Sequence, residues 1–87
     1  MKALTLRYDP GAPWPDLVWE GRKSIETRTW STSYRGDLLL TASKKPVGRF
    51  SGQAFCLVEL YDCRPMRPED EEAAMCACTL GRFAWSL

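Results

Sequence analysis

The strand-like segments of this chain follow one another with almost no helix between them. Alternating or continuous apolar residues mark five such segments, at residues 3–7, 24–29, 38–42, 53–62 and 82–87. Successive parallel strands need a crossover helix, and the 87 residues leave no room for several of them. We therefore expect one α+β domain over residues 1–87, built as a small mixed β-barrel with short peripheral helices.

Two helices are expected beside the strands. Asp16 is suited to cap a helix over residues 17–20, which Gly21 would end. A second helix is expected from Pro68 to Gly81, because acidic residues follow the proline where the helix dipole favours negative charge. The apolar run at 38–42 predicts a strand buried on both faces.

The segment from residue 21 to residue 36, GRKSIETRTWSTSYRG, is unusually rich in cations and aromatic rings. Its basic residues are Arg22, Lys23, Arg28 and Arg35, and they surround Glu26, Trp30 and Tyr34. Cations beside aromatic faces can hold a phosphate and stack a base. If residues 24–29 form a strand, alternation places Glu26 and Arg28 on one face.

Each residue of this segment has a structural reading beside the functional one. Lys23 can hold a phosphate, act as a base or nucleophile, or simply pair with Glu26 near the surface. The Glu26–Arg28 pair can orient Arg28 toward a ligand or be purely structural. Trp30 can stack a base or belong to the core, whereas Trp85 in the apolar last segment is expected to be core.

Lys44 and Cys76 can each be interpreted as a ligand-binding residue or as a residue with no functional role. Lys44 can contact a phosphate or be solvated at a strand end. The four cysteines are expected to stay reduced, and Cys76-Ala-Cys78 lacks the spacing of a structural zinc site. We expect Cys56 and Cys76 to be buried apolar groups, and we expect neither a metal site nor a cofactor.

Charge and composition favour some classes of function and exclude others. Residues 1–49 carry nine basic and five acidic side chains, and residues 50–87 carry three basic and six acidic ones. A basic half fits a surface that binds a polyanion, although scattered solvated charge gives the same count. The chain has no histidine, which excludes histidine-based catalysis. No secretory signal or membrane-length apolar run is apparent, so we expect a cytoplasmic protein without membrane contact.

The motif G-x-K-x-x-E-x-R-x-W followed by Y-R-G resembles the core motif of the ASCH domain, a member of the PUA-like superfamily. The likeness extends in order through LTLR, YRGDLLLTASKK, FCLVELYDCRPM and GRFAWSL. It implies a pseudo-barrel whose cleft is lined by the G-x-K-x-x-E-x-R segment. Relatives usually continue past the GRFAW strand, so we expect either a fragment or a homodimer that closes an open edge strand.

The resemblance implies that the cleft binds RNA or a modified nucleotide, through Lys23, Glu26, Arg28, Trp30, Tyr34, Arg35 and Lys44. An enzyme is the alternative, because one ASCH subgroup hydrolyses the amide of N4-acetylcytidine with a lysine, a threonine three residues later and a distant glutamate. Here Glu26 stands three residues after Lys23, and Thr27 is expected to face away. Glu59 and residues 69–72 are the only downstream candidates for the distant glutamate. A ribonuclease would use Lys23 and Glu26 as its acid–base pair. A protein-interaction module at the open edge is the third class.

Overall fold

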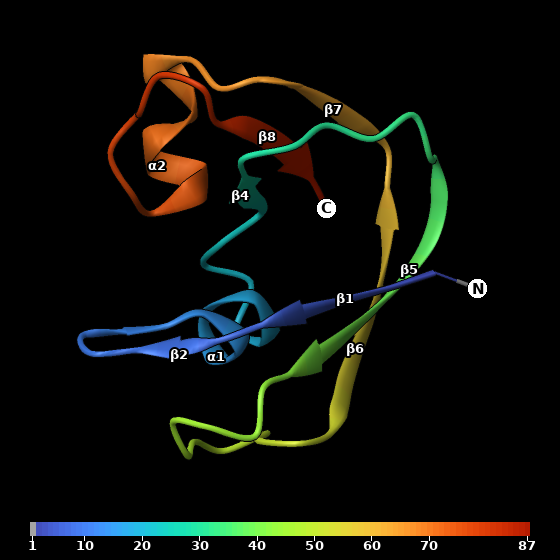
Figure 1. Ribbon diagram of the computed structural model, residues 1–87, viewed down its shortest axis with the longest axis vertical. Coiled ribbons are helices and arrows are strands. Elements are labelled where there is room, and N and C mark those ends of the chain that lie inside the picture. The colour runs from blue at the N-terminus through green and yellow to red at the C-terminus, as the bar shows by residue number, and fades with distance from the viewer. Residues whose placement is uncertain (1) are drawn as a thin grey trace.

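The computed structural model describes residues 2–87 and is built mostly of strands, as the α+β class predicts (Figure 1). Its elements are β1 (Lys2–Leu6), β2 (Tyr8–Asp9), β3 (Ala12–Pro13), α1 (Trp14–Trp19), β4 (Ile25–Arg28), β5 (Gly36–Ala42), β6 (Ala54–Leu60), β7 (Asp62–Pro65), a 3-10 turn (Pro68–Asp70), α2 (Glu71–Ala74) and β8 (Phe83–Ser86). The strands form sheets with the orders β1-β5-β6, β2-β3 and β4-β8-β7. None of the described helices is long and apolar enough to cross a membrane.

The sheet β1-β5-β6 carries most of the core. β1 runs parallel to β5 with Leu4 opposite Leu40, and β6 runs antiparallel to β5. Alternate residues of β5 are buried, whereas Leu39 is only partly covered. The expectation that this strand is buried on both faces is therefore wrong: side chains alternate across a strand, and the outward face of β5 is only partly covered.

The last strand, β8, lies in the middle of its sheet. It pairs antiparallel with β4 on one side and with β7 on the other. Trp85 is 5% exposed and packs in the same cluster as Leu6 and Leu40. Trp85 thus belongs to the core, as its apolar segment predicts.

The strands do not close into the barrel that we expected. The predicted strand 53–62 is interrupted at Tyr61, so that β6 and β7 belong to different sheets. A side chain spans the space between the sheets, because the Nη2 atom of Arg28 in β4 donates to the carbonyl oxygen of Thr5 in β1 at 2.6 Å. This contact ties an edge of one sheet to an edge of the other without a backbone ladder.

Helix α1 begins three residues earlier than predicted. Its N-cap is Pro13, and Pro15 lies in the first turn, where the missing amide hydrogen costs nothing. Asp16 is not the cap but lies in the first turn, and its carboxylate accepts a hydrogen bond from the Tyr8 hydroxyl at 2.7 Å. The predicted end at Gly21 is correct.

Helix α2 is much shorter than the predicted helix over residues 68–81. It ends after Ala74 because Met75 adopts a left-handed conformation, with φ of 58°. The residues from Cys76 to Arg82 therefore form an irregular segment between α2 and β8. This segment leads the chain back to β4, and the following strand, β8, pairs with β4.

Candidate functional site

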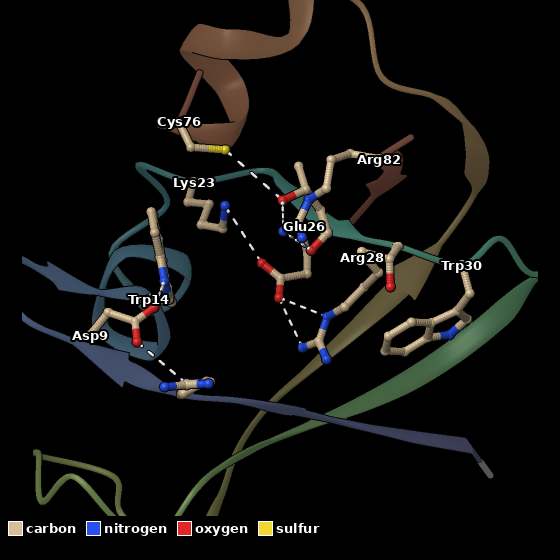
Figure 2. A pocket seen from close by; sticks show the side chains of 11 residues that line it. Asp9, Trp14, Lys23, Glu26, Arg28, Trp30, Cys76 and Arg82 are labelled. Carbon is tan, nitrogen blue, oxygen red and sulfur yellow. Dashed lines mark hydrogen bonds and ion pairs between the residues drawn. The ribbon is translucent and has the colours of Figure 1, made fainter. Parts of the chain in front are cut away.

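A cleft of about 340 Å³ lies beside β4, bordered by the end of β1, the start of α1 and the segment after α2 (Figure 2). Its lining residues are Arg7, Asp9, Trp14, Lys23, Glu26, Thr27, Arg28, Thr29, Trp30, Cys76 and Arg82. Figure 2 shows Trp14 and Trp30 on opposite sides, with Lys23, Glu26 and Arg28 between them. The cleft is therefore a polar floor between two aromatic walls.

Lys23 is placed by the turn that ends α1. Gly21 has φ of 77°, and the amides of Gly21 and Arg22 donate to Val18 and Leu17, which is the Schellman arrangement. The Lys23 side chain is 1% exposed. This turn fixes the backbone from which a buried lysine enters the cleft.

The Lys23 ammonium group has three neighbours. It donates to the carbonyl oxygen of Ala74, lies 3.6 Å from the Oε1 atom of Glu26, and lies 4.4 Å from the centre of the Trp14 ring. Burial lowers the pKa of Lys23 from its ordinary value of 10.5, and the nearby carboxylate of Glu26 acts against that shift. Lys23 is thus held in place by the fold itself.

Glu26 links Lys23 to Arg28. Its Oε2 atom accepts from Nε of Arg28 at 3.0 Å and lies 2.9 Å from Nη2. The two side chains lie on one face of β4, as strand alternation predicts. One carboxylate therefore serves two cations, and the group as a whole keeps a positive charge.

Trp30 lies at the rim of the cleft and is not a core residue, because 50% of it is exposed. Its ring meets Trp85 edge-on at 6.1 Å between centres, and the guanidinium carbon of Arg28 lies 5.5 Å from its centre. The Trp85 indole nitrogen donates to the carbonyl oxygen of Trp30 at 3.1 Å. The buried tryptophan thus positions the exposed one.

Three residues were not predicted to line the cleft: Arg82 and Cys76, which come from a distant segment, and Thr27 on β4 itself. Arg82 donates from Nη2 to Thr27, at 3.1 Å to the carbonyl oxygen and 2.9 Å to Oγ1. The Sγ atom of Cys76 lies 4.0 Å from the Oγ1 atom of Thr27. Thr27 was expected to face away, yet it lines the cleft because the irregular segment before β8 wraps around β4. Cys76 is only partly buried: it packs against the small core cluster of Ile25, Ala74 and Ala84 and also borders the cleft.

Arg7, Asp9 and Trp14 form a second group that the sequence analysis missed. The Trp14 indole nitrogen donates to Oδ2 of Asp9 at 2.8 Å, and Nε of Arg7 lies 3.3 Å from Oδ1. Arg7 follows β1, Asp9 ends β2, and Trp14 begins α1. The prolines and the glycine at residues 10–15 indicate a loop, but nothing in their sequence indicates that this loop faces the cleft.

Tyr34, Arg35 and Lys44 lie outside the lining. The Tyr34 hydroxyl donates to the carbonyl oxygen of Asp37, and Nη1 of Arg35 donates to the carbonyl oxygens of Thr32 and Tyr34. Lys44 is exposed in the loop between β5 and β6. Binding roles for these three residues remain predictions.

The charges of the lining favour an anion. Four basic residues and two acidic ones surround the cavity, so the field inside it is positive. Within residues 2–87, no three side chains of the metal-binding types His, Cys, Asp and Glu come together to hold an ion. The arrangement is suited to bind a negatively charged molecule that carries a flat ring.

Comparison with known families gives one match. Residues 11–85 match the model of the ASCH domain, which covers nearly the whole chain and includes most of the cleft. ASCH domains are PUA-like and are generally associated with RNA binding. No curated protein matches the chain significantly. The match to the family model, together with the motif on β4, means that the chain belongs to the ASCH domain family.

Proposed function

We propose that this protein binds RNA by taking one nucleotide, ordinary or modified, into the cleft beside β4. The observation that carries the proposal is the half-exposed ring of Trp30 at the rim of a positively charged cavity. Single-stranded RNA is recognised largely by bases that leave the stack and lie on aromatic or guanidinium planes. Trp30 offers such a plane, and Arg28 lies against the same ring.

The floor of the cleft supplies the polar part of recognition. Glu26 is an acceptor for the N–H groups at the edge of a base, and Arg28 holds the carboxylate from the other side. Lys23 is almost completely buried and already donates to the fold. Its role in this proposal is to orient Glu26 and to keep the site positive, rather than to contact a phosphate.

A pair of matched tryptophan variants tests the proposal. Trp30 and Trp19 are 50% and 51% exposed and each packs edge-on against one aromatic ring, but only Trp30 lines the cleft. Trp30→Leu should weaken binding of a short single-stranded RNA by about 1–3 kcal/mol, the usual contribution of one stacked base. Trp19→Leu should bind like the wild type. Fluorescence anisotropy over a series of salt concentrations measures both, and affinity that does not fall with salt would refute the proposal.

A hydrolase is the second candidate, favoured by the environment of Lys23. Its pKa is lowered by burial, which makes the neutral amine more accessible than in an exposed lysine, and Glu26 is beside it. The Thr27 hydroxyl also borders the cleft. Turnover of N4-acetylcytidine by the wild type that disappears in Lys23→Met would support an amidohydrolase. Cleavage of RNA that depends on both Lys23 and Glu26 would support a ribonuclease.

A further inference from the structure

Of the four basic side chains in the cleft, three are committed to the fold. Lys23 donates to Ala74, and Arg82 donates twice to Thr27. Arg28 bonds to Glu26 and to the carbonyl oxygen of Thr5. These residues make the cavity positive and each is held by the fold, although Nε and Nη1 of Arg82 and Nη1 of Arg28 have no hydrogen-bond partner within residues 2–87.

The fourth, Arg7, is held differently. Its side chain is 72% exposed, and its one ion pair joins Nε to Oδ1 of Asp9 at 3.3 Å. Within the described residues 2–87, no hydrogen bond or ion pair involves its terminal nitrogens. Arginine carries five N–H donors in a planar fork, so Asp9 leaves the four on the terminal nitrogens for a ligand.

The backbone of Arg7 is nevertheless fixed. Its neighbours Leu6 and Tyr8 are buried, at 0% and 8% exposure, and they anchor the end of β1 and the start of β2. Asp9 in turn is fixed by the indole nitrogen of Trp14 at 2.8 Å. Figure 2 shows the dashed ion pair from Asp9 at the edge of the cleft below Trp14. An exposed guanidinium is thus tethered at a defined place on the rim.

We propose that Arg7 is the phosphate-binding residue of the cleft and that its ligand is a nucleotide or a nucleotide unit of RNA, not a free nucleoside. Guanidinium and phosphate match as two parallel N–H···O contacts, which Lys23 cannot offer. Asp9 pairs with the Nε edge of Arg7, which leaves the two terminal nitrogens for the phosphate. The inference rests on the proposed function, because it assigns the phosphate of the same ligand.

The test compares phosphorylated and unphosphorylated probes. The four ribonucleosides and their 5′- and 3′-monophosphates are titrated into wild type, Arg7→Gln and Arg7→Lys at constant ionic strength, with binding followed by NMR. Arg22→Gln is the matched control, because Arg22 also has an exposed side chain paired with a nearby acid, Glu20, but lies outside the cleft. Thermal melting of each variant verifies the fold.

We expect Arg7→Gln to weaken binding of the best monophosphate by about tenfold, the effect of losing one charge-assisted contact. Binding of the matching nucleoside should not change, Arg7→Lys should recover part of the loss, and Arg22→Gln should bind like the wild type. Equal weakening of nucleoside and nucleotide, or no change with Arg7→Gln while Trp30→Leu still weakens binding, would overturn this inference alone. A wild type that binds none of the probes and no short RNA would overturn the proposed function with it.

Discussion

The molecule contains two carboxylates buried against arginine, and they differ in what they leave free. Asp70 accepts Nη1 and Nη2 of Arg64 on its two oxygens, and Oδ2 also accepts the amide of Arg67. Glu26 lines the cleft and accepts hydrogen bonds only from Arg28. Its Oε1 atom lies 3.6 Å from the Nζ atom of Lys23. Both oxygens of Asp70 accept hydrogen bonds from the fold, whereas the Oε1 atom of Glu26 faces only Lys23 and lies next to a cavity. The same chemistry therefore serves structure at one end of the chain and presents a binding surface at the other.

The largest expected effect on stability comes from neutralising Glu26. Glu26→Gln leaves Lys23, 1% exposed, without its carboxylate, and removing one partner of a buried pair costs about 3–5 kcal/mol. Unfolding in urea measures the loss. The double variant Lys23→Met/Glu26→Gln should recover part of it, because no buried charge then remains unpaired. A double variant less stable than Glu26→Gln alone would contradict this account.

Asp70 is expected to have a smaller effect that depends on acid pH. The Arg64 hydrogen bonds lower the pKa of Asp70 from 3.8 to about 2. The unfolded chain therefore takes up this proton at a higher pH than the folded protein does. The stabilisation is complete well above pH 3.8, and it is lost as the pH falls toward about 2.

Asp70→Asn should thus lower the free energy of unfolding by about 2 kcal/mol near neutral pH, with the difference from wild type shrinking in acid. RNA binding should not change, since Asp70 does not line the cleft. A loss of RNA binding without a loss of stability would remove the distinction between the two carboxylates.

The smallest expected effect on stability is the contribution of Lys23, which should appear at alkaline pH. Its pKa is lowered by burial, so between that value and 10.5 the unfolded chain holds more protons than the folded protein. Stability then rises with pH in that alkaline window. The difference between wild type and Lys23→Met, measured by urea unfolding over the alkaline range, should follow this rise. Parallel curves for the two proteins would show that Lys23 titrates as in the unfolded chain.

The sequence predicts the local part of the site and misses the tertiary part. Glu26 and Arg28 are two positions apart on one strand, so alternation alone places them together. Arg82 and Cys76 reach Thr27 from about fifty positions away, through an irregular segment that was expected to be helical. Because Met75 in a left-handed conformation ends α2 and carries no sequence signal comparable to glycine, the approach of that segment was not foreseeable.

The barrel was mispredicted for a related reason. An alternating pattern over residues 53–62 shows that the residues are extended, but it does not show which partner each half takes. β6 pairs with β5, whereas β7 pairs with β8. Trp30 was ambiguous as well: Trp85 stands in an apolar segment that predicts burial, whereas the polar residues after Trp30 fit either a rim or a core position.

The four tryptophans offer the most direct test of the cleft as the binding site. Each indole N–H gives its own NMR signal, and a short single-stranded RNA can be titrated while all four are observed. The account predicts that the signals of Trp14 and Trp30, which line the cleft, shift with RNA, while that of Trp19 does not. Shifts confined to Trp19, or no shift at any indole while RNA is bound, would contradict it.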